Sequence, residues 1–481
     1  MVAHCWHGWL MGIGAAGLFA AASVVGAGSQ DPLGFDSNKF VLRTVTVGDQ
    51  TVSVRAYEGI VTVAKPLDPT FQRLNVYIPT AYFEGGTVHG YNAQTAPIFL
   101  PNQVGGYMPG RPGVPGPDRS GAPNAIAQAL VRGYVVASPG ARGWPLRDAQ
   151  GRFIGKAPAA IVDLKAAVRW LRHNDALMPG NAERIISNGG SAGGALSALL
   201  GATGNNPDYE PYLKAIGATS GRDDVFAASC YCPITNLENA DSAYEWQFRG
   251  IHEYRGRGFS GTLNARQIEI SEQLRALFPA YVNRLQLKAP DGSPLKLDAN
   301  GDGPFKDYVK SFLIASAQKA LDGGKLLSEY KWITIEGGKV KDLDFAQYVR
   351  FIGRMKPAPA FDDLELRTPE TALFGSETTP ARHFTPFAKE HSSDKSIAEP
   401  SVIRMMNPMH YIGSPGTRTS LFWRIRHGAA DSDTSFAIPV LLATRLRNAG
   451  AKVDFALPWA VGHARDYDLS ELFAWIDEIC R

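Results

Sequence analysis

The sequence contains little cysteine and no block of like charge, and both absences exclude whole classes of protein. Its 481 residues include four cysteines and no C-x-x-C pair, so neither a disulfide scaffold nor a paired-cysteine zinc site is expected. There are 49 basic and 46 acidic residues, a net charge of +3, and no basic run stands out. Nucleic acid and anionic membrane surfaces are therefore not expected partners.

Charge is also missing from the N-terminal stretch 9–28, which is apolar and rich in Gly, Ala and Ser in its second half. Residues 25–27, Val-Gly-Ala, resemble a small-residue cleavage site. We predict a secretory signal peptide over 1–28 and a secreted or periplasmic protein with no membrane association after its removal. An uncleaved anchor is the alternative, since the stretch is long enough to span a bilayer; its low Leu and Ile content argues against this.

The remaining cysteines are few. Cys5 would leave with the signal peptide, so that Cys230, Cys232 and Cys480 could form at most one disulfide. Cys-Tyr-Cys at 230–232 is too short for a relaxed bridge. We expect structural, partly buried cysteines, and the pairing is left open.

Patterns of strand and helix alternate in the first half of the chain, after an opening antiparallel pair of strands at 40–64. Strands are expected at 74–78, 97–100 and 134–138 and before residue 189; helices are expected at 125–132, 159–174 and after residue 191. This alternation predicts an α/β fold with a parallel sheet.

The alternation stops after Tyr209 and returns at residue 420. Strands are then expected at 421–426 and 453–457, and helices at 438–450 and 469–480. We therefore predict a core built from 40–231 and 408–481, interrupted by an insertion at 232–407. Helices are expected inside the insertion at 269–287 and 306–321.

One loop of the insertion, Asp298–Gly303, begins like a calcium-binding EF-hand loop. The twelfth position would be Val309, where that motif requires a bidentate Glu, so a full EF-hand is excluded. A looser calcium site that includes Asp307 and a plain turn rich in Asp, Asn and Gly both stay open.

The sharpest motif is Gly189-Gly190-Ser191-Ala192-Gly193, a G-x-S-x-G between a strand with two Ile residues and an Ala/Leu-rich helix. This context is typical of the nucleophile elbow of α/β-hydrolases, in which a strained turn exposes the serine hydroxyl. Phosphate binding is disfavoured because no Lys follows the glycines, as a P-loop would require. We predict that Ser191 is a nucleophile.

An acid and a histidine follow Ser191 in the order that such hydrolases use. Asp431 and His463 each come just after a predicted strand, at the sheet edge where the chemistry is expected. The histidine would take the serine proton, and the carboxylate would orient the imidazole. Asp433 is the alternative orienting acid.

The loop Pro101–Gly110 after an early strand could supply a backbone N–H to an oxyanion hole. A glycine-rich surface loop is the equally weighted alternative.

Several motifs together resemble the bacterial tannases, serine esterases that cleave galloyl esters. They are Gly189–Gly194, Asn102–Gly110, Cys232–Ala240, Arg426–Phe436 and Asp454–Trp459. The resemblance runs from about residue 40 to the C-terminus. It implies an α/β-hydrolase fold with a large lid between nucleophile and acid, a triad of Ser191, Asp431 and His463, and an oxyanion hole from the N–H groups of Gly105 and Ala192.

The resemblance also implies a galloyl pocket at Lys356, Glu370 and Asp433. A buried cation and two carboxylates can pair with the three adjacent hydroxyls of gallate, and such a site would reject acids that lack them. Without the resemblance, Lys356 and Glu370 would be ordinary surface charges.

The resulting prediction is a secreted serine esterase that acts on galloyl esters of small phenolic substrates through a galloyl-Ser191 intermediate, with depsides left open. This chemistry requires no cofactor and no metal. The alternatives are a feruloyl or chlorogenate esterase on the same fold, a peptidase of the prolyl-oligopeptidase kind, and a non-catalytic binding protein. Oligomeric state is left open.

Overall fold

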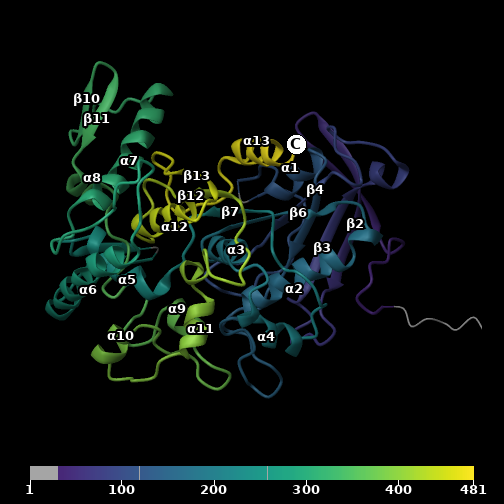
Figure 1. Cartoon of the computed structure of the whole chain (residues 1–481), viewed down its shortest axis with the longest axis horizontal. Helices are drawn as coiled ribbons and strands as arrows, with labels where there is room; N and C mark the ends of the chain where they lie inside the picture. The colour runs from purple at the N-terminus through teal and green to yellow at the C-terminus, as the bar shows by residue number, and fades with distance from the viewer. Residues whose placement is uncertain (1–30, 119, 257) are drawn as a thin grey trace, which may run out of the picture.

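The computed structural model describes residues 31–118, 120–256 and 258–481 (Figure 1). The predicted signal peptide, and with it Cys5, lies outside these residues. Within the described ranges, no helix combines the length and the apolar character needed to cross a bilayer.

A nine-stranded sheet forms the centre of the fold, in the order β1-β2-β3-β5-β4-β6-β7-β12-β13. Its strands are β1 (Val41–Val47), β2 (Gln50–Val61), β3 (Arg73–Pro79), β4 (Pro97–Pro101), β5 (Val135–Pro139), β6 (Asn181–Gly190), β7 (Ala227–Tyr231), β12 (Phe422–Arg426) and β13 (Lys452–Ala456). The pairs from β1 to β5 are antiparallel, and those from β5 to β13 are parallel. The predicted α/β architecture with a mostly parallel sheet is confirmed.

Strand β7 is the one strand of the nine-stranded sheet that the sequence patterns did not reveal. Its residues, Ala-Ala-Ser-Cys-Tyr, lack β-branched side chains and are all buried. Small side chains fit there because α3 approaches the sheet closely at Gly201, where any side chain would collide with Ala228 and Trp423. β7 lies between β6 and β12, and so joins the two parts of the core.

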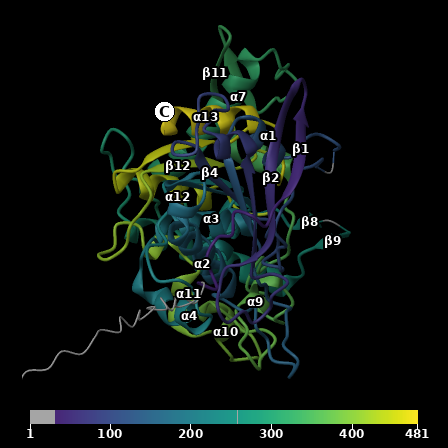
Figure 2. The same cartoon turned by 90° about the vertical axis from the view of Figure 1, so that its right-hand side faces the viewer.

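Helices cover both faces of the sheet (Figure 2). In the core they are α1 (Ala125–Val131), α2 (Ala159–His173), α3 (Ala192–Ala202), α4 (Glu210–Ala215), α12 (Ala437–Asn448) and α13 (Leu469–Cys480). α1 and α13 pack on one face, and α2, α3 and α12 on the other (Figure 1). Three short 3₁₀ helices, η1 (Thr80–Glu84), η2 (Asp175–Leu177) and η3 (Pro207–Tyr209), lie in connections.

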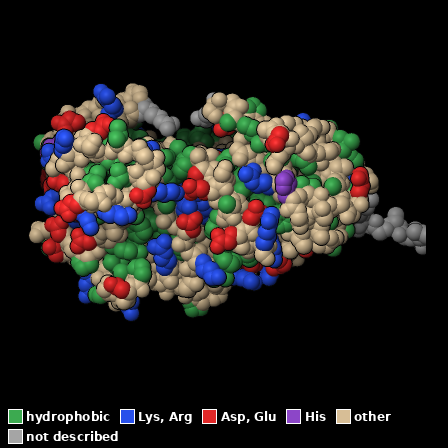
Figure 3. Space-filling model, turned by 90° about the horizontal axis from the view of Figure 1, so that it is seen from above, with side chains coloured by type: hydrophobic (Ala, Val, Ile, Leu, Met, Phe, Trp, Pro, Cys, Tyr) green, Lys and Arg blue, Asp and Glu red, His purple; other side chains and the backbone are tan. Residues whose placement is uncertain are grey.

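The chain between β7 and β12 forms a separate set of elements beside β12 and β13 (Figure 1). They are α5 (Leu237–Gln247), β8 (Glu253–Gly256), β9 (Phe259–Thr262), α6 (Ala265–Arg284), α7 (Pro304–Asp322), β10 (Ile333–Glu336), β11 (Lys339–Leu343), α8 (Phe345–Ile352), α9 (Pro369–Leu373), α10 (Pro386–His391), α11 (Pro400–Met405) and η4 (Pro408–His410). Both predicted helices of this segment are present, as α6 and α7. We call residues 232–407 the insertion; its limits as a domain stay a prediction. Between the insertion and the first strands of the core, one face of the surface is hollowed (Figure 3).

The loop that begins like an EF-hand uses its carboxylates internally. Asp298 Oδ1 accepts hydrogen bonds from the backbone N–H groups of Asn300 and Asp302. The carboxylate of Asp302 contacts Lys306 Nζ at 2.6 Å. These bonds hold the Asp298–Gly303 turn in the described structure, and calcium binding by this loop is not tested by them.

A buried charge cluster ties α2 to the chain segment that leads into β7. Lys165 Nζ lies 2.8 Å from Asp223 Oδ1, and Arg169 Nη2 lies 2.9 Å from Asp223 Oδ2. Burial raises the pKa of Asp223, but the charges of Lys165 and Arg169 outweigh it and hold that pKa below its ordinary value. Lys165 and Asp223 are fully buried, so each charge depends on the other for its solvation.

We expect Asp223→Ala to lower the free energy of unfolding by about 3–5 kcal/mol, because it leaves the Lys165 ammonium buried without a carboxylate. Urea denaturation measures the change. Glu210→Ala is the matched control: Glu210 is half-exposed and shares Arg169 with Asp223, so its loss should cost about 1 kcal/mol or less. Equal losses for both variants would contradict this account.

Candidate active site

Ser191 stands in the turn between β6 and α3, and its backbone is strained. Its φ of 58° and ψ of −126° lie in a region that side chains with a Cβ atom rarely occupy. The turn is also crowded: a side chain at Gly189 would collide with the carbonyl of Gly193, and one at Gly194 with the carbonyl of Tyr231. Glycine at these positions is therefore required for the turn that presents the Ser191 hydroxyl.

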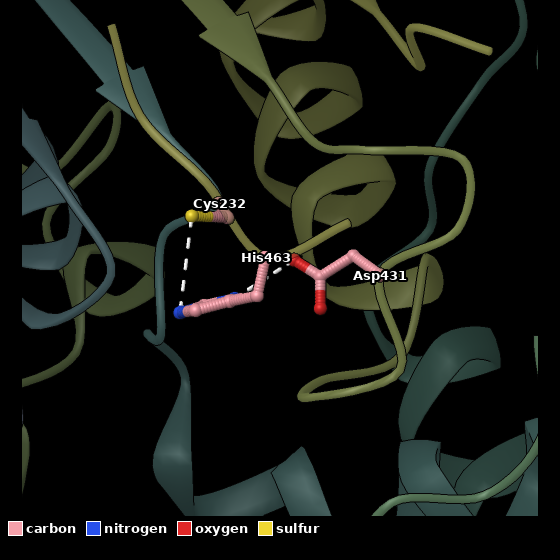
Figure 4. Close-up of side chains that lie close together, drawn as sticks. All are labelled: Cys232, Asp431 and His463. Atoms are coloured by element: carbon pink, nitrogen blue, oxygen red, sulfur yellow. Dashed lines mark hydrogen bonds and ion pairs between the residues drawn. The ribbon is translucent and has the colours of Figure 1, made fainter. Parts of the chain in front are cut away.

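Ser191, His463 and Asp431 form a continuous chain of hydrogen bonds. His463 Nε2 lies 2.9 Å from Ser191 Oγ, and His463 Nδ1 lies 2.8 Å from Asp431 Oδ2. Because the carboxylate can only accept, Nδ1 donates and Nε2 is left to accept the hydroxyl proton. The structure thus brings the three sequence-predicted residues together, and Figure 4 shows the side chains of Asp431 and His463 next to each other. Asp431, rather than the alternative Asp433, contacts the imidazole.

The surroundings of His463 favour its protonated form. Burial by itself lowers the pKa of the imidazole, but hydrogen bonding to Asp431 and the neighbouring sulfur of Cys232 outweigh it. The pKa of His463 is therefore raised above 6.5. Such a histidine is a strong proton acceptor once it is neutral.

Cys232 lies beside the histidine, a position that sequence reasoning missed. Its Sγ is 3.9 Å from His463 Nε2 and donates to the carbonyl of Ala464 at 3.2 Å (Figure 4). The sequence indicated only a structural cysteine, because nothing in Cys-Tyr-Cys reports proximity to a histidine 231 residues away. Cys230, Cys232 and Cys480 are all buried free thiols.

Cys232, Asp431 and His463 are also the one group in the described part of the chain with the spacing of metal ligands, their ligand atoms lying within 4.8 Å of one another. Both ring nitrogens of His463 already make hydrogen bonds. A cation bound here would compete with the contact between His463 and Ser191. That the chemistry needs no metal stays a prediction.

The two predicted oxyanion donors flank Ser191. Gly105 lies exposed in the loop after β4 and lines the same cleft as Ser191, and Ala192 is the first residue of α3. Within the described residues, neither backbone N–H donates to a protein acceptor. Both groups are thus available to a negatively charged oxygen, and the N-terminus of α3 adds a favourable dipole.

Asn102 connects the loop of Gly105 to the turn of Ser191. Its buried Nδ2 donates to the carbonyls of Asn188 and Gly193 at 3.1 and 3.0 Å, and its Oδ1 accepts from the N–H of Val104. The side-chain amide of Asn102 therefore fixes the loop of Gly105 relative to the turn that contains Ala192. The sequence signal for it was weak: a single amide residue directly after the apolar strand β4.

Lys356, Glu370 and Asp433 form a second cluster next to the triad, which we call the charge cluster. Lys356 Nζ lies 2.9 Å from Asp433 Oδ1, and the backbone N–H of Asp433 donates to Asp431 Oδ1 at 2.8 Å. Lys356 also lies 3.9 Å from the ring centroid of Phe361. Lys356 and Glu370 come from the insertion, and Asp433 comes from the loop after β12.

Burial sets the electrostatics of the charge cluster. Burial raises the pKa of Glu370 above its ordinary value, although the positive charge of Lys356 acts to lower it. Burial alone would raise the pKa of Asp433, but the charge of Lys356 outweighs burial and holds that pKa below its ordinary value. Burial alone would lower the pKa of Lys356, but the carboxylates of Asp433 and Glu370 outweigh burial and raise that pKa. The cluster is thus a buried cation between an ionised carboxylate and one that is easily protonated, and it can both donate and accept hydrogen bonds.

A cleft of about 1040 Å³ opens at Ser191. Ser191, Cys232 and His463 line it, together with core residues from the 103–126 segment and from 464–469. The charge cluster does not line this cleft. The reacting atoms therefore lie between two distinct environments, one on the insertion side and one on the core side.

Comparisons with known proteins show which families this chain is similar to. The family model BD-FAE matches residues 117–281. Two Mycobacterium tuberculosis proteins match in shorter segments: esterase LipQ at 39% identity over 88 residues and esterase LipC at 38% identity over 178 residues. These segments span only 20% and 38% of the two esterases.

Solved structures match over nearly their whole length. The tannase of Fusobacterium nucleatum is 47% identical with a TM-score of 0.91, and the tannin acyl hydrolase of Lactobacillus plantarum is 46% identical with a TM-score of 0.90. A tannin acyl hydrolase in complex with ethyl gallate is 46% identical with a TM-score of 0.89. Each match covers 93% of this chain and 99% of the other. The chain belongs to the bacterial tannase family and is a carboxylic ester hydrolase with an α/β-hydrolase fold.

Proposed function

We propose that this protein is a secreted or periplasmic serine esterase that hydrolyses galloyl esters through a galloyl-Ser191 acyl-enzyme. The observation that carries the proposal is the hydrogen-bonded chain Ser191–His463–Asp431 directly beside the buried charge cluster. The similarity to a tannin acyl hydrolase that binds ethyl gallate supports the substrate class. The apolar stretch 9–28 supports secretion.

The reaction follows from the positions of these groups. His463 Nε2 takes the Ser191 proton as Oγ attacks the ester carbonyl, while Asp431 stabilises the imidazolium. The N–H groups of Gly105 and Ala192 donate hydrogen bonds to the developing oxyanion. The alcohol leaves with the proton from His463, and water then repeats the sequence on the acyl-enzyme, releasing the acid.

The charge cluster would recognise the acyl ring. Gallate presents three adjacent hydroxyls, which both donate and accept, and the cluster offers an ammonium donor and two carboxyl groups. A ring without these hydroxyls would leave buried charges unpaired, which costs far more than the loss of an apolar contact. Asp433 lies two residues after Asp431 and donates its backbone N–H to the Asp431 carboxylate, which places this recognition next to the reacting bond.

Hydrolysis of methyl gallate, compared with methyl ferulate, is the test of the proposal. We expect wild type to prefer methyl gallate strongly in kcat/KM. We expect Ser191→Ala to be inactive on both esters with an unchanged unfolding midpoint, since the nucleophile is lost but a small side chain remains. Comparable turnover of ferulate would instead favour a broader aromatic-acid esterase, and an active Ser191→Ala would exclude the acyl-enzyme.

Lys356→Met should reduce kcat/KM on methyl gallate roughly 10- to 100-fold, the value of a hydrogen bond to a charged group. The loss on methyl benzoate, whose ring has no hydroxyls, should be smaller. Lys310→Met is the matched control, because Lys310 pairs with Asp342 away from the site at 2.5 Å. An equal loss of kcat/KM on both esters would show that Lys356 supports the fold and does not bind the ring hydroxyls.

The pH dependence of kcat/KM should reflect the raised pKa of His463. The base must be neutral to act, so activity should fall with decreasing pH along a limb whose midpoint lies above 6.5. Cys232→Ala should move this midpoint to lower pH, because the sulfur contributes to the raised pKa. A wild-type midpoint at or below 6.5 would contradict the assignment.

A further inference from the structure

A second pocket, distinct from the cleft at Ser191, lies between the core and the insertion. It has a volume of about 550 Å³, and its walls come from core residues 144–156 and insertion residues 366–381. None of its lining residues lines the cleft at Ser191. No carboxylate is among the described residues that line it, whereas three cations are: Arg147, Lys156 and Arg367. We call it the cationic pocket.

Lys156 is the buried cation of this pocket. Only 7% of the residue is exposed, and Nζ donates to the carbonyls of Ala372 and Pro380 at 2.7 and 2.6 Å. Nζ also lies 3.9 Å from the ring centroid of Phe153. Burial, together with the charge of Arg147, lowers the pKa of Lys156 to about 8. Because its described partners are neutral groups, the positive charge is not compensated, and a bound anion would stabilise it.

The two arginines differ in how far their charge is available to a ligand. Arg147 is exposed, and its Nη1 donates to the carbonyl of Gly151 at 2.7 Å. Its guanidinium carbon lies 3.7 Å from the centroid of the same Phe153 ring that Lys156 contacts. Arg367 instead pairs with two carboxylates of its own segment, those of Asp363 and Glu365. Lys156 and Arg147 are therefore the cations that a ligand can neutralise.

Trp144 adds an aromatic surface to the pocket. It is half-buried, and its Nε1 donates to the carbonyl of Gly106 at 3.1 Å, which fixes the indole ring. The exposed residues Pro369 and Pro380 line the same pocket. An indole and two proline rings offer flat apolar surfaces against which a planar ring can pack. The pocket thus combines cations with a surface for an aromatic ring.

We propose that the cationic pocket binds an aromatic carboxylate, with its carboxylate at Lys156 and Arg147 and its ring against Trp144. A volume of about 550 Å³ lies within the roughly 300–1,000 Å³ that is typical of small-molecule pockets. Gallate, the acid released under the proposed function, has this chemistry, so the choice of gallate as the ligand rests on that function. An inorganic anion would pair with the cations but would leave Trp144 and the prolines without a contact.

Equilibrium dialysis with gallate and with pyrogallol tests the site, because pyrogallol carries the same three hydroxyls without the carboxylate. We expect wild type to bind two gallates per chain, one at the charge cluster and one at the cationic pocket, but only one pyrogallol. Arg147→Ala should weaken one gallate site about fivefold, and Lys156→Met should weaken it about tenfold or more. Neither variant should change pyrogallol binding. Arg147 is exposed, so its variant tests the pocket even if Lys156→Met fails to fold.

Arg152→Ala is the matched control, because this neighbouring exposed arginine pairs with Asp148 and Glu377 and does not line the pocket. It should leave both gallate sites unchanged. A wild type that binds no gallate, or binds it at a single site that only Lys356→Met weakens, would overturn the cationic pocket. A gallate site that Arg147→Ala weakens, with no site that Lys356→Met affects, would support the pocket and contradict the ring recognition of the proposed function.

Discussion

The strained backbone at Ser191 is the constraint on which the rest of the site depends. A serine with a φ of 58° is stable only where the surrounding structure fixes its backbone, and several neighbouring elements do so here. β6 and β7 fix the incoming strand, α3 fixes the outgoing chain, and the N–H of Ser191 donates to the carbonyl of Tyr231 at 3.0 Å. The buried amide of Asn102 then ties the neighbouring loop to this turn, so nucleophile and oxyanion donors form one rigid unit.

The charged side chains around this unit are buried, and each one pairs with a specific partner. Asp431 is fully buried and acts on His463, while Asp433, two residues later, turns toward Lys356. One short loop thus contributes to both the triad and the charge cluster, and the backbone N–H of Asp433 donates to the carboxylate of Asp431. In the low-dielectric surroundings each charge has a strong effect on its partner and would be costly alone. This coupling allows Lys356 and Glu370 of the insertion to pair with Asp433 directly beside the triad of the core.

Much of the fold was predictable because buried strands and amphipathic helices leave periodic patterns. The strands at 97–100 and 421–426 and the helix at 469–480 were expected within a residue or two of β4, β12 and α13. β7 was missed because a strand made of Ala, Ser and Cys has no β-branched signal; its place is set by the close approach of Gly201. The hairpins β8–β9 and β10–β11 were missed as well, since each of their strands has only 4 or 5 residues and none is fully buried.

For the site, the sequence by itself determined the chemical groups and their order: a serine between glycines, then an acid and a histidine, each directly after a strand. Parallel strands end at a common edge, so these three could be expected to meet. Only the tertiary structure decided that Asp431 rather than Asp433 contacts His463, that Cys232 lies against the imidazole, and that Asn102 joins the two loops. Such contacts join residues far apart in the chain, and their geometry depends on how strands and loops pack, which no local pattern records.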